Sequence, residues 1–145
     1  MIKYFHVGMK GVIRHPKDDR VLLMKMHNGA WDLPGGRLDE GERGFEETLT
    51  RELHEELPGI RDVTIGRQLG AERMAHDLGP RALEQGVDTS MLPGGGVGLV
   101  IVLYDVRASL PDPVQVSDEH ASFAWTTRAG AAGAFPHASH LFVPQ

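Results

Sequence analysis

Three glutamates spaced for one face of a helix are the residues of this chain best suited to chemistry. Glu52, Glu55 and Glu56 lie in a segment of helical periodicity, and positions i, i+3 and i+4 of a helix project from neighbouring points. Like charges at this spacing repel by about 0.2–0.5 kcal/mol per pair, and Arg51 adds one positive charge among them. A divalent cation such as Mg²⁺ or Mn²⁺ would offset the repulsion, because both ions prefer carboxylate oxygens. The alternative interpretation is an acidic helix face in contact with solvent.

The element that must position these carboxylates is an amphipathic helix. An apolar side chain recurs every four residues, at Phe45, Leu49, Leu53 and Leu57, and such a stripe is typical of a helix packed on a core. Pro58 and Gly59 follow, and both residue types are common just past a helix end. We therefore expect the helix to lie on the core with its carboxylates at the rim of a cleft.

A Gly-Gly turn and an acidic loop precede this helix, and the stretch from Gly36 to Ile60 resembles the Nudix box, the signature of the Nudix hydrolases. The family pattern is G-x5-E-x7-R-E-U-x-E-E-x-G-U, where U is an aliphatic residue. Gly36 and Glu42 match its first spacing, and RELHEE at residues 51–56 matches its central hexapeptide at every position. Eight residues instead of seven separate Glu42 from Arg51, and Pro58 adds one residue after the hexapeptide. Both extra residues fall outside the hexapeptide and leave its geometry intact.

The resemblance implies a role for each box residue. Glu52 and Glu56 would be the main metal ligands, with Glu55 beside them and a backbone carbonyl from Gly36. Arg51 would orient the glutamates, so that Arg51, Glu52 and Glu55 take part in catalysis. The bound cations would neutralise charge on the phosphate oxygens and activate a water molecule.

A second acidic segment supplies candidates for the general base. In the Nudix family this base is a box glutamate, or a Glu or His from a distant loop. DEHASFAW at residues 118–125 resembles a segment found near the C-terminal end of many Nudix domains. Glu119 and His120 are therefore candidate catalytic residues. A turn whose charges are solvated would explain the same sequence.

Length and composition narrow the class of protein. A chain of 145 residues fits one domain, 1–145. Cysteine is absent, which excludes disulfides and thiolate metal sites. A net charge of −5 argues against broad nucleic-acid binding. Because no signal peptide or membrane-spanning apolar run is visible, we expect a cytoplasmic protein away from the membrane. A homodimer is compatible with this composition.

The resemblance implies an α/β/α sandwich around a mixed β-sheet. Local patterns predict strands at residues 6–13, 20–26, 31–33, 63–74, 97–106 and 119–126. The first two are expected to form a hairpin, and 97–106, the most apolar, to be central. Thr126 or Thr127 should cap a short helix ending at Phe135. We expect a loosely structured tail from Pro136 and a substrate-side loop at 75–95.

The predicted activity is hydrolysis, dependent on Mg²⁺ or Mn²⁺, of a phosphoanhydride in a nucleoside diphosphate linked to another group. The box leaves the small-molecule substrate open among nucleoside triphosphates, nucleotide sugars or ADP-ribose, and dinucleoside polyphosphates. A nucleobase would stack on an aromatic side chain near the cleft, with Tyr4, Phe5 and Phe135 as candidates. The alternative from another class is a Nudix-like sensor that binds a nucleotide without turnover, against which the intact set of Arg51 and glutamates argues.

Overall fold

The computed structural model describes residues 4–74 and 97–142. Its elements, in chain order, are β1 (Phe5–Ile13), β2 (Val21–Lys25), β3 (Trp31–Asp32), β4 (Gly35–Arg37), α1 (Phe45–Glu56), β5 (Arg61–Arg73), β6 (Gly98–Ser109), β7 (Ser122–Thr126), α3 (Arg128–Ala134) and the 3₁₀ helix η1 (Pro136–Phe142). The loop expected at 75–95 lies outside the described residues. Among the described residues, no helix combines the length and apolar composition that crossing a membrane requires.

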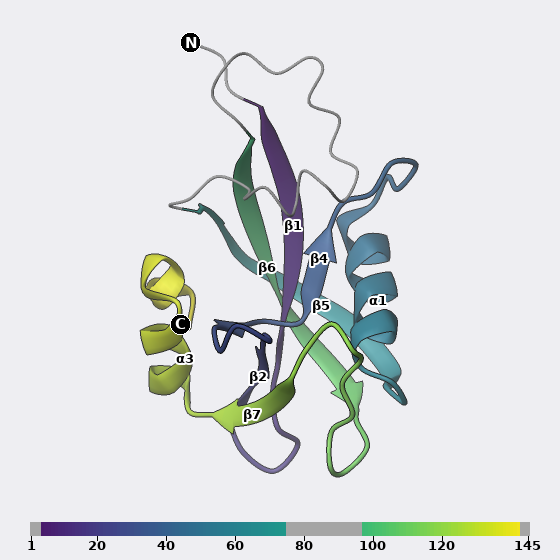
Figure 1. Ribbon diagram of the computed structural model, residues 1–145, viewed down its shortest axis with the longest axis vertical. Coiled ribbons are helices and arrows are strands. Elements are labelled where there is room, and N and C mark those ends of the chain that lie inside the picture. Colours follow the sequence, from purple (N-terminus) through teal and green to yellow (C-terminus); the bar gives the residue numbers. More distant parts are fainter. Residues whose placement is uncertain (1–3, 75–96, 143–145) are drawn as a thin grey trace.

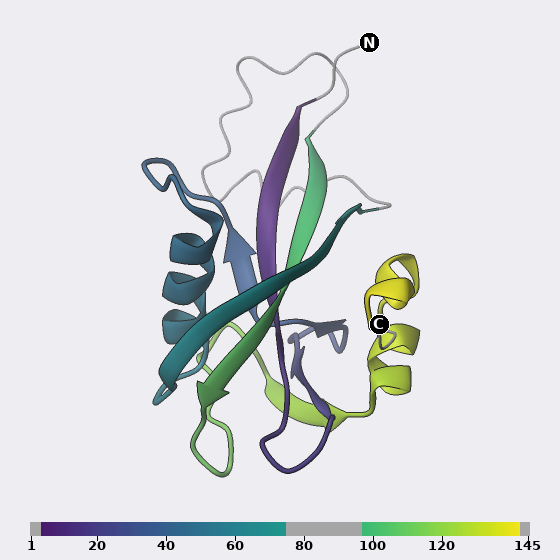
Figure 2. The ribbon, with the colours of Figure 1, turned by 180° about the vertical axis from the view of Figure 1, so that it is seen from behind.

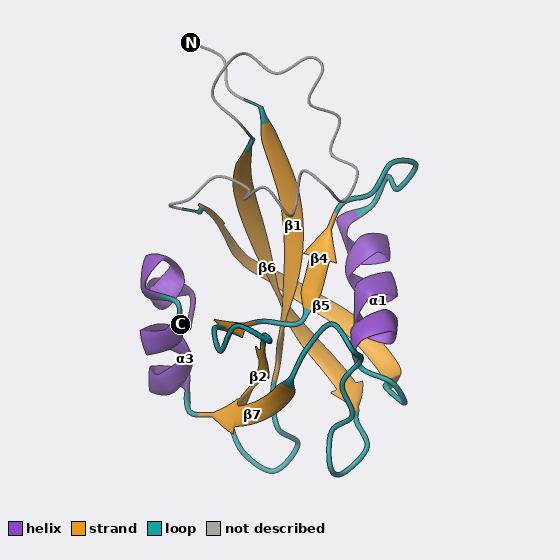
Figure 3. Ribbon diagram, in the orientation of Figure 1, coloured by secondary structure: helices purple, strands orange, loops and turns teal. Residues whose placement is uncertain are grey.

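The larger sheet is mixed and has the order β4-β1-β6-β5. β1 and β6 run parallel, while β4 and β5 pair antiparallel with their neighbours. β6 therefore lies inside the sheet, which confirms that the most apolar strand is central. A smaller antiparallel sheet has the order β3-β2-β7. Figure 3 shows the strands of both sheets between the helices.

The prediction that the first two strands pair as a hairpin is wrong, because β1 and β2 belong to different sheets. Their backbones are bridged at the turn between them, where Arg14 pairs with Val21. Beyond that bridge β4 takes the free edge of β1. Gly35 makes this pairing close, since a Cβ atom there would lie 2.9 Å from the Cα of Lys10. β2 is left to pair with β3 and β7.

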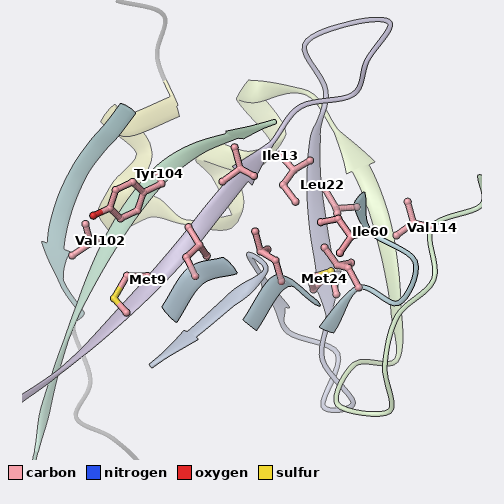
Figure 4. Packing of buried hydrophobic residues seen from close by; sticks show 12 residues of the cluster. Met9, Ile13, Leu22, Met24, Ile60, Val102, Tyr104 and Val114 are labelled. Atoms are coloured by element: carbon pink, nitrogen blue, oxygen red, sulfur yellow. The ribbon is translucent and has the colours of Figure 1, made fainter. Parts of the chain in front are cut away.

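Side chains of the strands alternate between two cores, as the two-residue period of a strand requires. The core beneath α1 contains Met9, Ile13, Leu22, Met24, Val102, Tyr104 and Val106 (Figure 4). The core beneath α3 and η1 contains Val12, Val21, Leu23, Ile101 and Leu103. Figures 1 and 2 show α1 and α3 on opposite sides of the strands. This arrangement is the α/β/α sandwich that the resemblance implied.

The apolar stripe predicted for the box helix holds α1 on its core. Leu49, Leu53 and Leu57 are fully buried, and burying each leucine contributes roughly 1.5–3 kcal/mol. Phe45, in the first turn, stays at the surface. Glu46 and Glu47 also lie in that turn, where the helix dipole favours negative charge.

The C-terminal part is more ordered than the sequence indicated. The hydroxyl of Thr127 caps α3 by accepting a hydrogen bond from the N–H of Gly130 at 3.0 Å, which confirms one of the two predicted caps. The expectation of a loose tail is wrong, because Pro136–Phe142 forms η1. Phe142 is buried in the second core and anchors this helix. Leu141 and Phe142 are adjacent large apolar residues, and two adjacent residues give no periodic signal.

Candidate active site

A cavity of about 620 Å³ opens between α1, the strands and the C-terminal helices. From α1 it is lined by Glu52, Glu55 and Glu56, and Glu119 contributes from the loop before β7. From β6 and the C-terminal helices it is lined by Leu99, Ile101, Leu103, Phe135 and Phe142. The three box glutamates therefore do share one site, and that site has one acidic wall and one apolar wall.

Glu56 is the most deeply buried carboxylate of the site, with 3% of the residue exposed. Its Oε2 accepts a long hydrogen bond, 3.4 Å, from the N–H of Gly35. Burial raises the pKa of Glu56 to about 8, although the nearby charge of Lys10 opposes the shift. At neutral pH and without a cation, most of this carboxyl is therefore protonated.

His120 faces Glu56 but does not form an ion pair with it. Its Nε2 lies 3.8 Å from Glu56 Oε2, which is too long for a hydrogen bond. Burial lowers the pKa of His120, while burial raises that of Glu56. Both groups are therefore mainly neutral near pH 7, and the contact between them is one of packing.

Lys10 is a residue of this site that the sequence analysis missed. Its Nζ donates to Asp32 Oδ2 at 2.9 Å and, more weakly, to the Gly35 carbonyl at 3.4 Å. Burial lowers the pKa of Lys10, but the carboxylates of Asp32 and Glu56 raise it by more, so it stays charged. A lysine in the middle of the apolar strand HVGMKGVI was the available signal, because a lysine seldom lies inside unless it is paired.

Arg51 joins the acidic loop to α1. Its Nη2 and Nε donate to the two carboxylate oxygens of Glu42 at 2.9 and 3.0 Å, a planar, bidentate pair. The hydrogen bonds from Arg51 lower the pKa of Glu42 to about 2. Nη1 of Arg51 also lies 3.0 Å from Glu52 and 3.2 Å from Glu55. The extra loop residue has therefore not displaced Glu42 from the box arginine.

Gly36 permits a close approach between the loop and the helix. A Cβ atom at this position would overlap the carboxylate of Glu52, so any side chain there would push that carboxylate aside. Burial raises the pKa of Glu52 as well. The glycine of the box is thus needed because the Glu52 carboxylate occupies the place of its side chain.

The residues present fit a hard divalent cation. Glu52, Glu55 and Glu56 offer carboxylate oxygens, the ligands that Mg²⁺ and Mn²⁺ prefer. Burial raises the pKa of Glu52 and of Glu56 by more than the nearby charges of Arg51 and Lys10 lower it. Among the described residues, no three Asp, Glu or His side chains are already gathered around one point. Glu55 instead pairs with Arg51. The three carboxylates therefore line one cavity without being arranged around one point.

The two candidate bases, Glu119 and His120, have different surroundings in the segment before β7. The N–H of Ser117 donates to the Glu56 carbonyl at 3.0 Å, and that of Ala121 donates to the Lys25 carbonyl at 2.7 Å. These bonds hold both ends of a turn, which the N–H of His120 closes by donating to the Ser117 carbonyl at 3.1 Å, so β7 starts at Ser122 instead of residue 119. In this turn Glu119 is exposed and lines the cavity, whereas His120 is buried.

The three aromatic candidates for base stacking differ in whether they line the cavity. Phe135 lines the cavity, and its ring is stacked on that of Phe142 with centroids 6.1 Å apart. Tyr4 and Phe5 are exposed side chains, and the Phe5 ring lies against Arg73. Of the three, Phe135 is the one that the fold brings to the site.

An α/β/α sandwich with a carboxylate-bearing helix and a Gly-Gly loop at one cavity defines a Nudix-type domain. The family model of the NUDIX domain matches residues 5–142, so the chain belongs to the Nudix family and is a hydrolase of that family.

Solved structures with a similar fold include the MutT protein from Methanosarcina mazei Go1, with a TM-score of 0.72, 19% identity and coverage of 98% of this chain and 93% of that chain. The E. coli dihydroneopterin triphosphate pyrophosphohydrolase has a TM-score of 0.70 and 16% identity, with 97% and 95% coverage. A C. elegans Ap4A hydrolase has a TM-score of 0.65 and 19% identity, with 96% and 92% coverage. At these identities the likeness concerns the fold. A search of curated proteins found no match.

Proposed function

We propose that this hydrolase uses Mg²⁺ or Mn²⁺ to cleave a phosphoanhydride in a nucleoside diphosphate linked to another group. The observation that carries the proposal is the lining of one cavity by Glu52, Glu55, Glu56 and Glu119 on one side and by apolar side chains on the other. Such a cavity suits a ligand with a charged phosphate part and a flat, apolar part. Similar structures named for Ap4A and for dihydroneopterin triphosphate support the choice of bond.

Each residue has a proposed task. Glu52, Glu55 and Glu56 hold the divalent cation together with the Gly36 carbonyl; when bound, the cation neutralises phosphate charge and favours ionisation of water. Arg51 pairs with both Glu42 and Glu52 and so keeps the Glu52 carboxylate in position. Glu119 is exposed at the cavity and takes the proton of the attacking water at its carboxylate.

The expected partner is the small nucleotide substrate. The lack of cysteine is compatible with the reducing cytoplasm as the compartment. A homodimer stays a prediction, which sedimentation would test.

The test of this function is a screen of nucleoside triphosphates, nucleotide sugars, ADP-ribose and dinucleoside polyphosphates with Mg²⁺, scored by release of phosphorylated products. At least one class should be turned over, and EDTA should abolish the activity. Glu52→Gln should lower kcat by a factor of 10² or more, because removing a preorganised charge at the reacting centre has roughly this effect. Tight binding of one nucleotide without turnover of any would move the protein to the sensor class.

Metal binding can be tested without turnover. Mg²⁺ or Mn²⁺ should raise the melting temperature, because a ligand that binds only the folded state stabilises it. Glu56→Gln should remove most of this shift, whereas Glu47→Gln, on the exposed part of the same helix, should keep it. An equal shift in both variants would contradict the assigned site.

A further inference from the structure

The apolar wall of the cavity carries one carboxylate that the proposed reaction does not use. Among the described residues of β5, β6, α3 and η1 that line the cavity, Glu72 is the charged one. Its register partner on β6 is Ile101, and both side chains line the cavity. A carboxylate placed on an apolar wall is costly unless polar groups satisfy it. Glu72 therefore gives the apolar wall a polar group that a ligand in the cavity can meet.

His140 fixes the position of this carboxylate. Its Nε2 lies 2.8 Å from Glu72 Oε1, and the Glu72 side chain is only 31% exposed. Gly70 brings the two elements together, since a Cβ atom there would lie 2.5 Å from the side chain of Leu141 on η1. The absence of a side chain on β5 at this point lets η1 pack against the strand. The contact with His140 uses Oε1 and leaves Oε2 to accept a hydrogen bond from a ligand.

The surroundings of Glu72 are suited to a flat heterocycle. Phe135 lines the same cavity and is stacked on Phe142, with an angle of 24° between the rings. An aromatic face of this kind binds another ring by stacking. An ionised carboxylate only accepts hydrogen bonds, so its complement is a ring edge that carries N–H donors. Guanine has a ring N–H beside an exocyclic amino group, whereas uracil has one N–H between two carbonyls.

We propose that Glu72, held by His140, determines specificity by selecting a guanine base against the apolar wall. The identification of the ligand as a nucleotide rests on the proposed function. The selection itself concerns binding of the base and does not require turnover.

Guanosine and inosine test this proposal directly, because they differ only in the amino group at C2. Their dissociation constants are measured by NMR titration in EDTA, so that neither phosphate nor metal contributes. The wild-type protein should bind guanosine about tenfold tighter, since a hydrogen bond to a charged group contributes roughly this much. Glu72→Gln should lose most of the preference, because its amide lacks the negative charge and replaces one of the two acceptor oxygens with an NH₂ donor. Glu40→Gln, an exposed glutamate on the acidic loop, should keep it.

His140→Ala tests whether His140 positions the Glu72 carboxylate or only stabilises the fold. The variant should keep the wild-type affinity for inosine and lose part of the preference for guanosine, because only the amino group depends on the held carboxylate. Equal affinity of the wild type for both nucleosides, binding of neither, or a preference that survives in Glu72→Gln would overturn the proposal. A guanosine preference without turnover of any nucleotide would contradict the proposed function alone, and turnover without the preference would contradict this inference alone.

Discussion

Glu56 has two properties that oppose each other in the metal-free protein. It points an oxygen toward Gly35 and lies beside the charged Lys10, both of which favour the ionised carboxylate. Burial favours the protonated form more strongly and raises its pKa to about 8. A divalent cation would reverse this balance, because it compensates the negative charge inside the protein.

This balance predicts a pH dependence of stability. The ordinary pKa of Glu56, 4.5, applies to the unfolded chain, and the folded value is about 8. Between these values the folded state keeps a proton that the unfolded state has lost, so the unfolding free energy in EDTA should fall as pH rises through this window, by at most about 1.4 kcal/mol per pH unit. Urea titrations at several pH values measure it. Glu56→Gln, which cannot ionise, should show a flatter dependence, and equal slopes in both proteins would contradict the account of Glu56.

The two candidate bases should respond differently to substitution. Glu119→Gln should lower kcat by about 10²–10⁴ and leave the melting temperature unchanged, because Glu119 is exposed. His120→Ala should instead cost about 1–3 kcal/mol of stability, as most damaging core substitutions do, because His120 is buried against Glu56. Steady-state kinetics and thermal melts distinguish the two effects. Full activity of Glu119→Gln would leave the base to a box glutamate.

The sequence revealed the box residues because their spacing along one helix is fixed by local geometry. It did not reveal Lys10 and Asp32, which are far apart in the chain and meet through the pairing of β1 with β4 and the position of β3. Glu72 and His140 were missed for the same reason, since only the packing of η1 on β5 joins them.

At the junction of β4 and α1, the loop after β4 contacts the glutamates and the arginine of the box helix. Gly36 lets the loop approach Glu52, and the pair of Arg51 with Glu42 holds the same loop to the helix. Replacing Arg51 with lysine would keep the positive charge but lose the planar guanidinium group that forms two hydrogen bonds with Glu42. The position of the loop therefore depends on the geometry of this pair as well as on its charge.

Gly36→Ala tests this junction. The added methyl group would displace the Glu52 carboxylate, and a small misplacement of a catalytic group costs about 10² in rate. We expect a loss of that size in kcat/KM, with the fold retained by circular dichroism. Gly133→Ala is the matched control, since its Cβ would meet no atom within 4 Å. Similar activities for the two variants would remove the steric argument for Gly36.

The sequence predicted an element well where a periodic pattern of apolar residues determines it, and poorly where pairing between distant strands determines it. Leu49, Leu53 and Leu57 identified both the box helix and its buried face. The hairpin failed because β4, only Gly35–Arg37, competes for the edge of β1, and so short a strand has almost no sequence signal. The helix η1 was missed because its anchors are two adjacent side chains, Leu141 and Phe142, which give no periodic pattern.

At the scale of the molecule, the sandwich places a different chemical surface on each wall of one cavity. The wall from α1 carries the glutamates, and the wall from β6 and the C-terminal helices carries apolar side chains. The larger sheet supplies both cores through alternate residues of the same strands. This division explains why the sequence indicated the acidic wall, which one helix supplies, but not the apolar wall, which several distant elements form.

We infer that this hydrolase directs water to a phosphorus atom held beside the box glutamates. Hydrolysis of a nucleotide sugar, or of the best substrate of the screen, in ¹⁸O-labelled water with Mg²⁺ tests it most directly. Mass spectrometry should place the label on a phosphate oxygen of one product only, and a nucleotide sugar should give a nucleoside monophosphate and a sugar phosphate. Label on the sugar carbon, with release of a nucleoside diphosphate and free sugar, would contradict the claim.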